Sequence, residues 1–420
     1  MSNIEKLLEG VKVEWKTLGE YVDYEQPTAY LVKSANYDNR FVTPVLTAGK
    51  TFILGYTDDI NGIYKASESP VIIFDDFTTA NKWVDFDFKV KSSAIKILTS
   101  KDKSKAILKY IYYCLNTLPS GLIDGDHKRQ WIGIYSNKTI PIPCPDDPKK
   151  SLEIQKEIVR VLDKFSMLTA ELQAELQARK SQYEYYRNQL LTYPMEESDQ
   201  PSLRSSWSAT SIQSSDNPTQ PLSTPNTHTG NSVLQPRGKK VEWKVLEEVV
   251  DIKRGKRLVK TQLEKTGKYA VYQNCMIPLG YYDKSNVIAD TTFIISAGSA
   301  GEIGYSSVDF WAADDVYYFV IKNDLKSRFL YYFLLTQQQK IYSQVRRSSV
   351  PRLSKTAFEK LLIPIPSLEE QERIIVILNK FDTLTTSITE GLPKEIELRQ
   401  KQYEYYRDML LSFPKNNIKA

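Results

Sequence analysis

The chain has 420 residues, of which 56 are lysine or arginine and 51 are aspartate or glutamate, so its formal charge is +5. This length predicts two or three separate hydrophobic cores, and the small positive charge only slightly favours a polyanionic partner. The three cysteines have no C-x-x-C spacing, which excludes a disulfide framework or a zinc ribbon, and no apolar run approaches the roughly 20 residues that cross a bilayer. We therefore expect a cytoplasmic protein without membrane association.

Residues 1–150 are predicted to form a mixed α/β module. The apolar, β-branched runs at Val71–Phe74 and Ile95–Leu98 are typical of strands, and residues 105–116 of an apolar helix. The motif Val-Glu-Trp-Lys at Val13–Lys16 opens the module, and Ile-Pro-Ile-Pro at Ile140–Pro143 closes it. A proline excludes helix for the residue before it, so the closing segment is expected to be extended.

Residues 151–194 are predicted to form one long helix. Its mostly apolar seam positions follow steps of three and four, as in a coiled coil: Ile158, Val161, Phe165, Leu168, Leu172, Leu176, Arg179, Tyr183, Tyr186 and Leu190. Such a helix would be about 60 Å long, too long for a module of this size to bury, so its simplest partner is a second helix of the same kind. Tyr183 and Tyr186 are interpreted as seam residues rather than as part of a partner surface, for which Glu184 and Arg187 are the better candidates.

Residues 195–240 differ from the rest of the chain. They are rich in Ser, Thr, Pro, Asn and Gln and have almost no apolar residues. Burial cannot offset the entropy of ordering such a segment, so we expect a flexible linker.

The second half repeats the first. Val241–Lys244, Ile363–Pro366 and Ile377–Phe381 match motifs of the first half in the same order, and Gln402–Arg407 is identical to Gln182–Arg187. Between these anchors the sequences diverge, although both have runs typical of strands and the second has an apolar helix at residues 327–336. A duplication is therefore predicted, in which residues 241–367 form a second module with a different surface.

Residues 368–414 are predicted to form a second long helix, followed by a tail at residues 415–420. Gly391-Leu392-Pro393 has no counterpart in the first helix and predicts a local break, because an interior proline costs about 3 kcal/mol. The predicted fold class is α+β, with two similar mixed α/β domains. Two long antiparallel helices are expected to join them as a coiled coil with pseudo-twofold symmetry.

The sequence argues against catalysis. It has only two histidines, His127 and His228, so the usual proton shuttle and metal ligand is nearly missing. The stretch from Ala48 to Thr51 resembles the end of a phosphate-binding loop, but Pro44 stands where the loop needs glycine. Gly298, Gly301 and Gly304 do not have the spacing of the dinucleotide-binding motif. They instead predict a glycine-rich loop whose backbone can approach a ligand closely. The acidic pairs that begin at Asp75, Asp146 and Asp314 are interpreted as solvated turns rather than a nuclease metal site.

With V-E-W-K-x-L, I-P-I-P, E-x-Q and R-x-x-Q-Y-E-Y-Y-R in both halves, the chain resembles the specificity subunits of type I restriction-modification systems. The resemblance implies two target-recognition domains, each reading one half of a bipartite, asymmetric site in double-stranded DNA, with the helices as a spacer. It also implies a non-catalytic chain without cofactors, which binds DNA methyltransferase (modification) subunits and, through them, restriction endonuclease and translocase subunits. These partners would use S-adenosylmethionine, ATP and magnesium. The candidate docking residues are Glu184, Arg187, Glu404 and Arg407.

Candidate DNA-binding residues follow from chemistry, because Lys and Arg supply phosphate contacts and Arg, Lys, Asn and Gln read base edges. In the second module the candidates are Arg254, Lys256, Arg257, Lys260, Arg346, Arg347 and Arg352. In the first they are Lys128, Arg129 and Gln130, and Arg129 falls opposite Arg352 when both are counted back from the proline pairs. The loops at residues 74–82 and 296–304 add Lys82 and Ser299.

Three alternatives remain open from the sequence. Each basic cluster could be a solvated turn without a ligand. The whole chain could be a coiled-coil scaffold that binds only proteins, which predicts no salt-dependent DNA binding. A methyltransferase or nuclease in its own right would show activity without partners. The sequence has neither the Asn-Pro-Pro-aromatic tetrapeptide of an amino-methyltransferase nor a helicase-like phosphate-binding loop, which argues against it.

Overall fold

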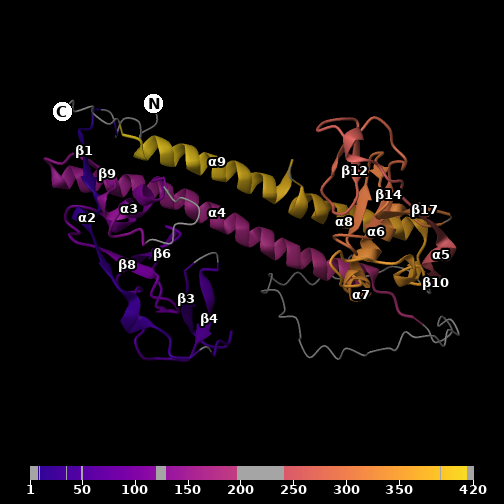
Figure 1. Ribbon diagram of the computed structural model, residues 1–420, viewed down its shortest axis with the longest axis horizontal. Coiled ribbons are helices and arrows are strands. Elements are labelled where there is room, and N and C mark those ends of the chain that lie inside the picture. Colours follow the sequence, from indigo (N-terminus) through magenta and orange to yellow (C-terminus); the bar gives the residue numbers. More distant parts are fainter. Residues whose placement is uncertain are drawn as a thin grey trace. The chain divides into compact units, whose positions relative to one another are not determined.

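The computed structural model describes residues 8, 10–34, 36–48, 51–119, 129–195, 241–322, 324–387 and 389–413. The chain divides into two compact units, one made of residues up to 172 together with those from 396, the other of residues 173–395. Helix α4 (Pro148–Leu191) therefore begins in unit 1 and ends in unit 2, whereas α9 (Gly391–Leu411) begins in unit 2 and ends in unit 1 (Figure 1). Lys128, the expected tail and all but the first residue of the expected linker lie outside the described residues.

The first module occupies most of unit 1 and mixes strands with short helices. Its elements in chain order are β1 (Val13–Thr17), α2 (Leu18–Tyr21), β2 (Val22–Glu25), η1 (Pro27–Tyr30), β3 (Thr43–Leu46), β4 (Ile53–Thr57), β5 (Val71–Asp75), β6 (Asn81–Val84), β7 (Lys89–Val90), β8 (Ile95–Ser100), α3 (Leu108–Leu115), η2 (Tyr135–Asn137) and β9 (Thr139–Pro143).

The second module lies in unit 2. Its elements are β10 (Glu242–Val245), α5 (Leu246–Val249), β11 (Val250–Arg254), η4 (Lys260–Gln262), β12 (Tyr269–Tyr272), β13 (Gly280–Tyr282), β14 (Thr291–Ile295), β15 (Ile303–Ser306), β16 (Trp311–Ala312), β17 (Val316–Ile321), α6 (Ser327–Thr336), α7 (Gln338–Ser343), η5 (Lys355–Ala357) and β18 (Leu362–Ile365).

The two modules have the same strand topology. The four-stranded sheet has the order β2-β8-β5-β6 in the first and β11-β17-β14-β15 in the second, and the three-stranded sheets are β4-β3-β7 and β13-β12-β16. Every strand of the first module thus has its counterpart nine strands later. The prediction of two similar mixed α/β modules is confirmed, although the sequences between the anchors differ.

The repeated motifs at the ends of each module are the two strands of one ribbon. The Val-Glu-Trp-Lys strand β1 pairs antiparallel with the Ile-Pro-Ile-Pro strand β9, so that Trp15 faces Pro141. In the second module β10 pairs with β18 in the same way, with Trp243 opposite Pro364. Prolines are tolerated here because each ribbon has only two strands, and both are edges.

Each module has a hydrophobic core between its larger sheet and a long helix. The central strands β5 and β14 are buried along their whole length, and each contains an apolar run, Val71–Phe74 or Phe293–Ile295. In unit 2, α6 packs against β14 and β15 and also against α8 (Leu368–Thr386). In unit 1 the corresponding core includes Ile158 of α4 and Leu410 of α9.

The long helices contact each other through the repeated aromatic motifs. In unit 1, Phe165 of α4 stacks on Tyr406 of α9 with ring centroids 5.1 Å apart. In unit 2, Phe381 of α8 lies 6.2 Å from Tyr183 and 5.8 Å from Tyr186, both on α4. Because Phe381 is the counterpart of Phe165 and Tyr186 that of Tyr406, the two contacts are reciprocal. The prediction that these tyrosines belong to the packing seam is confirmed.

The expected break in the second helical region is present, and it separates two helices. Helix α8 ends at Thr386 and α9 begins at Gly391, so Pro393 lies in the first turn of α9, where its missing N–H costs no hydrogen bond. Gly391 has φ +80, and a Cβ there would lie 2.5 Å from the carbonyl oxygen of Thr383. Helix α4 is unbroken over 44 residues, which corresponds to about 66 Å.

A buried glutamine fastens each module to its long helix. The Oε1 atom of Gln155 on α4 accepts the N–H of Ile107, 2.9 Å away, at the start of α3. The Oε1 atom of Gln371 on α8 accepts the N–H of Lys326, 2.8 Å away, at the start of α6, and its Nε2 donates to the carbonyl oxygen of Asp324. Both glutamines are fully buried, which explains why the E-x-Q motif is repeated.

No helix of the described residues is long and apolar enough to cross a membrane.

Replacing Gln371 by Ala should lower the free energy of unfolding by about 1–3 kcal/mol, because it leaves part-buried main-chain groups at the start of α6 without their partners. Chemical denaturation of the full chain measures the change. Gln177→Ala, an exposed position on the same helix as Gln155, is the matched control and should change little. Equal stability of the two variants would contradict the fastening role.

Candidate nucleic-acid interface

Three predicted segments of the second module come together at one end of its larger sheet. The turn between β14 and β15 forms a β-bridge with the Arg352 segment through Ala297. The N–H of Gly298 donates to the carbonyl oxygen of Pro351 at 3.1 Å, and Arg346 and Arg352 exchange two backbone hydrogen bonds. Ser299, Arg346, Arg347 and Arg352 are therefore close neighbours, held by main-chain contacts.

The basic segment after β11 lies beside the same end. The Arg254 Nε donates to the carbonyl oxygen of Asp314 at 2.7 Å, in the turn between β16 and β17. The next residue of that turn, Asp315, accepts the N–H of Ser296 at 2.7 Å. This turn thus connects the Arg254 segment to the β14–β15 turn.

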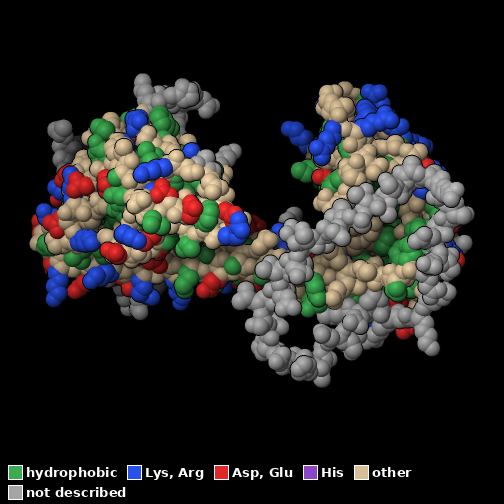
Figure 2. Space-filling view, turned by 90° about the horizontal axis from the view of Figure 1, so that it is seen from below, with side chains coloured by type: hydrophobic (Ala, Val, Ile, Leu, Met, Phe, Trp, Pro, Cys, Tyr) green, Lys and Arg blue, Asp and Glu red, His purple; other side chains and the backbone are tan. Residues whose placement is uncertain are grey.

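The basic side chains of this end are available to a ligand. The following six are exposed, and none forms an ion pair within the described part of the chain: Lys256, Arg257, Lys260, Arg346, Arg347 and Arg352. Figure 2 shows Lys and Arg side chains gathered on one end of the second module, with few acidic ones among them. In water such charges attract a polyanion, and contact with phosphates releases counterions.

The first module places Arg129 at the equivalent turn. The N–H of Gln130 donates to the carbonyl oxygen of Asp76 in the turn after β5, just as the N–H of Leu353 donates to Ser296 after β14, each at 2.8 Å. The guanidinium of Arg129 is 3.6 Å from the carboxylate of Asp76 and is half-exposed. The alignment of Arg129 with Arg352 therefore corresponds to one place in the fold, and exposed Lys82 lies on β6 beyond the same turn.

Two interpretations of the first module need correction. Gln130 is only 2% exposed, because it lies under the turn that it helps to hold, so its side chain is not on the accessible surface. The pair Asp75-Asp76 is buried rather than solvated. Asp75 accepts the N–H of Phe77 and the hydroxyl of Thr78 within its own turn. Asp76 accepts the N–H of Trp131 and lies 3.4 Å from the buried ammonium of Lys96.

The described residues hold no group of three or more His, Cys, Asp or Glu side chains that could bind a metal ion.

A repeated cation at the junction of module and helix was missed from the sequence. Lys109 of α3 lies 4.1 Å from the Trp83 ring and 3.6 Å from Asp163 of α4, and its burial lowers its pKa. In unit 2, Arg328 of α6 lies 4.2 Å from the Tyr305 ring and 2.7 Å from Asp382 of α8.

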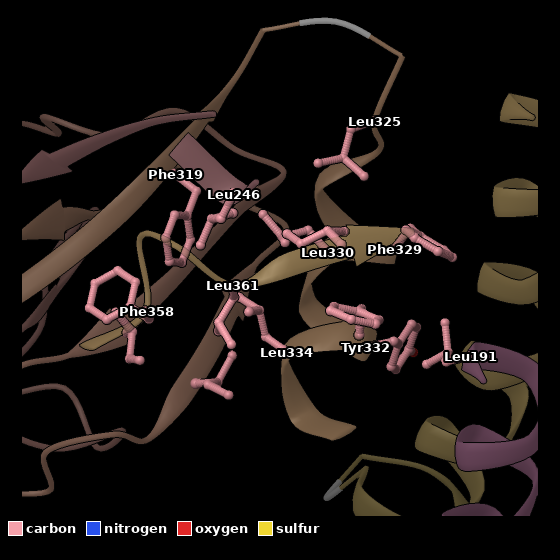
Figure 3. Close-up of a cluster of buried hydrophobic side chains, with 14 of the residues drawn as sticks. Leu191, Leu246, Phe319, Leu325, Phe329, Leu330, Tyr332, Leu334, Phe358 and Leu361 are labelled. Atoms are coloured by element: carbon pink, nitrogen blue, oxygen red, sulfur yellow. The ribbon is translucent and has the colours of Figure 1, made fainter. Parts of the chain in front are cut away.

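The two junction cations occupy equivalent positions, the second residue of α3 and of α6. Trp83 and Tyr305 are also equivalent, since each is the third residue of its strand. Figure 3 shows that α6 also presents Tyr332 toward Leu191 at the end of α4. The shared pattern of a cation followed three residues later by Tyr-Tyr, at Lys109 and Arg328, is the signal that could have found this junction.

Comparison with known proteins gives the family. Residues 239–398 match the model of the type I restriction modification DNA specificity domain. The chain is 46% identical to the specificity subunit of the type I restriction enzymes EcoR124I and EcoR124II of Escherichia coli, over 99% of this chain and 98% of that protein. The chain belongs to the family of type I restriction-modification specificity subunits.

Two further specificity subunits are similar along their whole length. A putative type I specificity subunit of Haemophilus influenzae is 27% identical over 98% of both chains. The solved S subunit of a type I restriction-modification system from M. genitalium has a TM-score of 0.60 at 19% identity, covering 99% of this chain and 100% of that one. The latter shows a shared fold.

The docking candidates of this specificity subunit are only partly exposed. Glu184 and Glu404 are exposed, whereas Arg187 and Arg407 are half-buried and lie over tyrosine rings of their own helices. The exposed aromatic side chains of the repeated motif are Tyr185 and Tyr405, at 47% and 65% exposure. The three-and-four spacing of the sequence did not identify these two tyrosines, because that spacing marks only the residues of the packing seam and not those on the exposed side of the helix.

Replacing Asp76 by Ala should destabilise the chain by about 3–5 kcal/mol, because it leaves the buried ammonium of Lys96 without a counter-charge. The double variant with Lys96→Met should recover much of this loss. Denaturant unfolding measures both, and Asp146→Ala, which removes an exposed carboxylate, is the control. A single variant as stable as the control would show that the pair does not hold the turn.

Proposed function

We propose that the two modules are target-recognition domains, and that each reads one half of a bipartite, asymmetric site in double-stranded DNA. One observation carries the proposal. The same strand order occurs twice, and in both copies an exposed arginine, Arg129 or Arg352, is held at the turn after the central strand. The side chains around this turn differ between the copies, so two different half-sites are expected.

The division of labour within each module follows from chemistry. Exposed lysines and arginines without ion pairs bind phosphates and supply affinity, whereas side chains on the turns meet base edges and supply discrimination. In the second module Lys256, Arg257 and Lys260 suit phosphate contacts, and Arg352 and Ser299 suit base contacts. In the first, Lys82 and Arg129 remain candidates, together with Lys128.

The helices serve as the spacer between residues 1–150 and residues 241–367, the proposed target-recognition domains. The reciprocal packing of Phe165 on Tyr406 and of Tyr186 on Phe381 supports an antiparallel coiled coil with pseudo-twofold symmetry. The segments that form it are residues 151–194 and 368–414.

Covalent chemistry belongs to partner subunits in this proposal. Modification subunits, with S-adenosylmethionine, bind the repeated helical regions near Glu184 and Glu404, and restriction subunits, with ATP and magnesium, join through them. Support comes from the family and from the exposed, identical Glu-Tyr pairs of the two motifs. The complex would act on DNA in the cytoplasm.

Exchanging residues 241–362 for the corresponding segment of another specificity subunit should change one half of the methylated sequence and leave the other half intact. The chimaera is co-expressed with the modification subunit of its own system, and methylated bases are mapped across a genome. Changes in both halves would contradict separate reading by the two modules.

Arg257→Ala and Arg347→Ala should each weaken DNA binding and reduce the slope of log affinity against log salt by about one, because each variant removes one phosphate contact. Titrations of the assembled complex at several salt concentrations measure the slope. Arg160→Ala removes an exposed arginine of α4 and should leave the slope unchanged. A slope equal to that of this control would remove both arginines from the interface.

A further inference from the structure

We infer that Asn274, in the loop between β12 and β13, reads an adenine in the half-site of the second module. The inference rests on the proposed function of that module and adds a third loop to its reading surface. Sequence motifs did not mark this loop, because its neighbours in the fold are distant in the chain.

The loop is fixed against the β14–β15 turn. The N–H of Ser299 donates to the carbonyl oxygen of Asn274 at 2.8 Å. Gly298 has φ +83, and a Cβ at that position would lie only 2.6 Å from the same oxygen. A glycine is thus required for Asn274 to approach the turn this closely. Through Gly298 the turn also holds the Arg352 segment.

Three loops therefore bring Asn274, Ser299 and Arg352 to one place. Arginine pairs with guanine, and serine accepts several bases, so both suit base edges but neither selects adenine. An asparagine amide does select adenine, because its oxygen accepts from the N6 amino group while its nitrogen donates to N7. Of the three side chains, only that of Asn274 supplies the group that selects adenine.

The Asn274 side chain is free to make this contact. It is exposed, and its amide forms no hydrogen bond within the described part of the chain. Such an amide, on a loop that its own backbone holds in place, loses little further freedom on binding.

The rest of the loop fits an interface with DNA. Ile277, three residues further on, is 76% exposed, although its carbonyl oxygen accepts the thiol of Cys275. An aliphatic side chain presented in this way suits the methyl group of a thymine. Arg346, an exposed basic residue bridged to Arg352, lies in the neighbouring segment and suits a flanking phosphate.

The first module differs at this point. Asn274 is the second residue after the end of β12, and the second residue after the end of its counterpart β3 is Ala48. The first module therefore has the methyl group of Ala48 where the second has the amide of Asn274. The difference predicts that the adenine contact belongs to the second half-site alone.

The test uses the complex assembled with its modification subunit, with two variants, Asn274→Ala and Asn274→Asp. Methylation rates are measured on duplexes that carry each of the four base pairs at every position of the second half-site. Asn274→Ala should lower the preference for adenine at one position roughly ten-fold or more and leave the other positions unchanged. Asn274→Asp should move the preference at that position toward cytosine, because a carboxylate accepts from the cytosine N4 amino group.

Gln177→Ala, an exposed amide on α4, is the matched control and should keep the parent pattern. The inference is overturned if both Asn274 variants discriminate as the parent does at every position. It is also overturned if the affected position lies in the half-site that does not follow the exchange of residues 241–362. A parent complex whose methylated sequence does not respond to that exchange would instead refute the proposed function, whatever Asn274 does.

Discussion

The apolar seams of the long helices have to be buried, and in each unit they are buried against the other copy of the repeat. Phe165 of the first copy packs on Tyr406 of the second, and Phe381 of the second on Tyr186 of the first. The cores follow the same rule, since Leu410 completes the core of unit 1 and Leu190 that of unit 2. Neither copy has a complete core of its own.

The residues that join each module to its long helix are separate from the exposed residues proposed to contact DNA. Buried groups such as Gln371, and half-buried ones such as Arg328, join module and helix. The exposed arginines lie at one end of the larger sheet, on segments whose backbones are fixed by main-chain hydrogen bonds. The positive charges therefore lie where the side chains are exposed. Holding Arg352 there carries no desolvation cost before a polyanion binds.

The repeat made most of the fold predictable. Two copies of each motif defined the modules, the helices and the correspondence of Arg129 with Arg352, and the Gly-Leu-Pro sequence marked the break before α9. Burial of polar groups was not predictable, because it depends on contacts between distant segments. From the sequence, Asp76 is typical of a solvated turn, whereas in the structure it is buried beside Lys96 of β8. Asn274 gains its interest only from Ser299, which lies on another loop.

The way in which Gln155 and Gln371 hold the modules has a consequence for inheritance. Both amides bind the peptide groups of the segment they grip, and the residues there are Ile107 in one module and Lys326 in the other. Recognition of peptide groups does not depend on side-chain identity. A segment acquired by recombination, with unrelated side chains away from this junction, would still offer its peptide groups to the same amide. New specificities can therefore arise in a single genetic event.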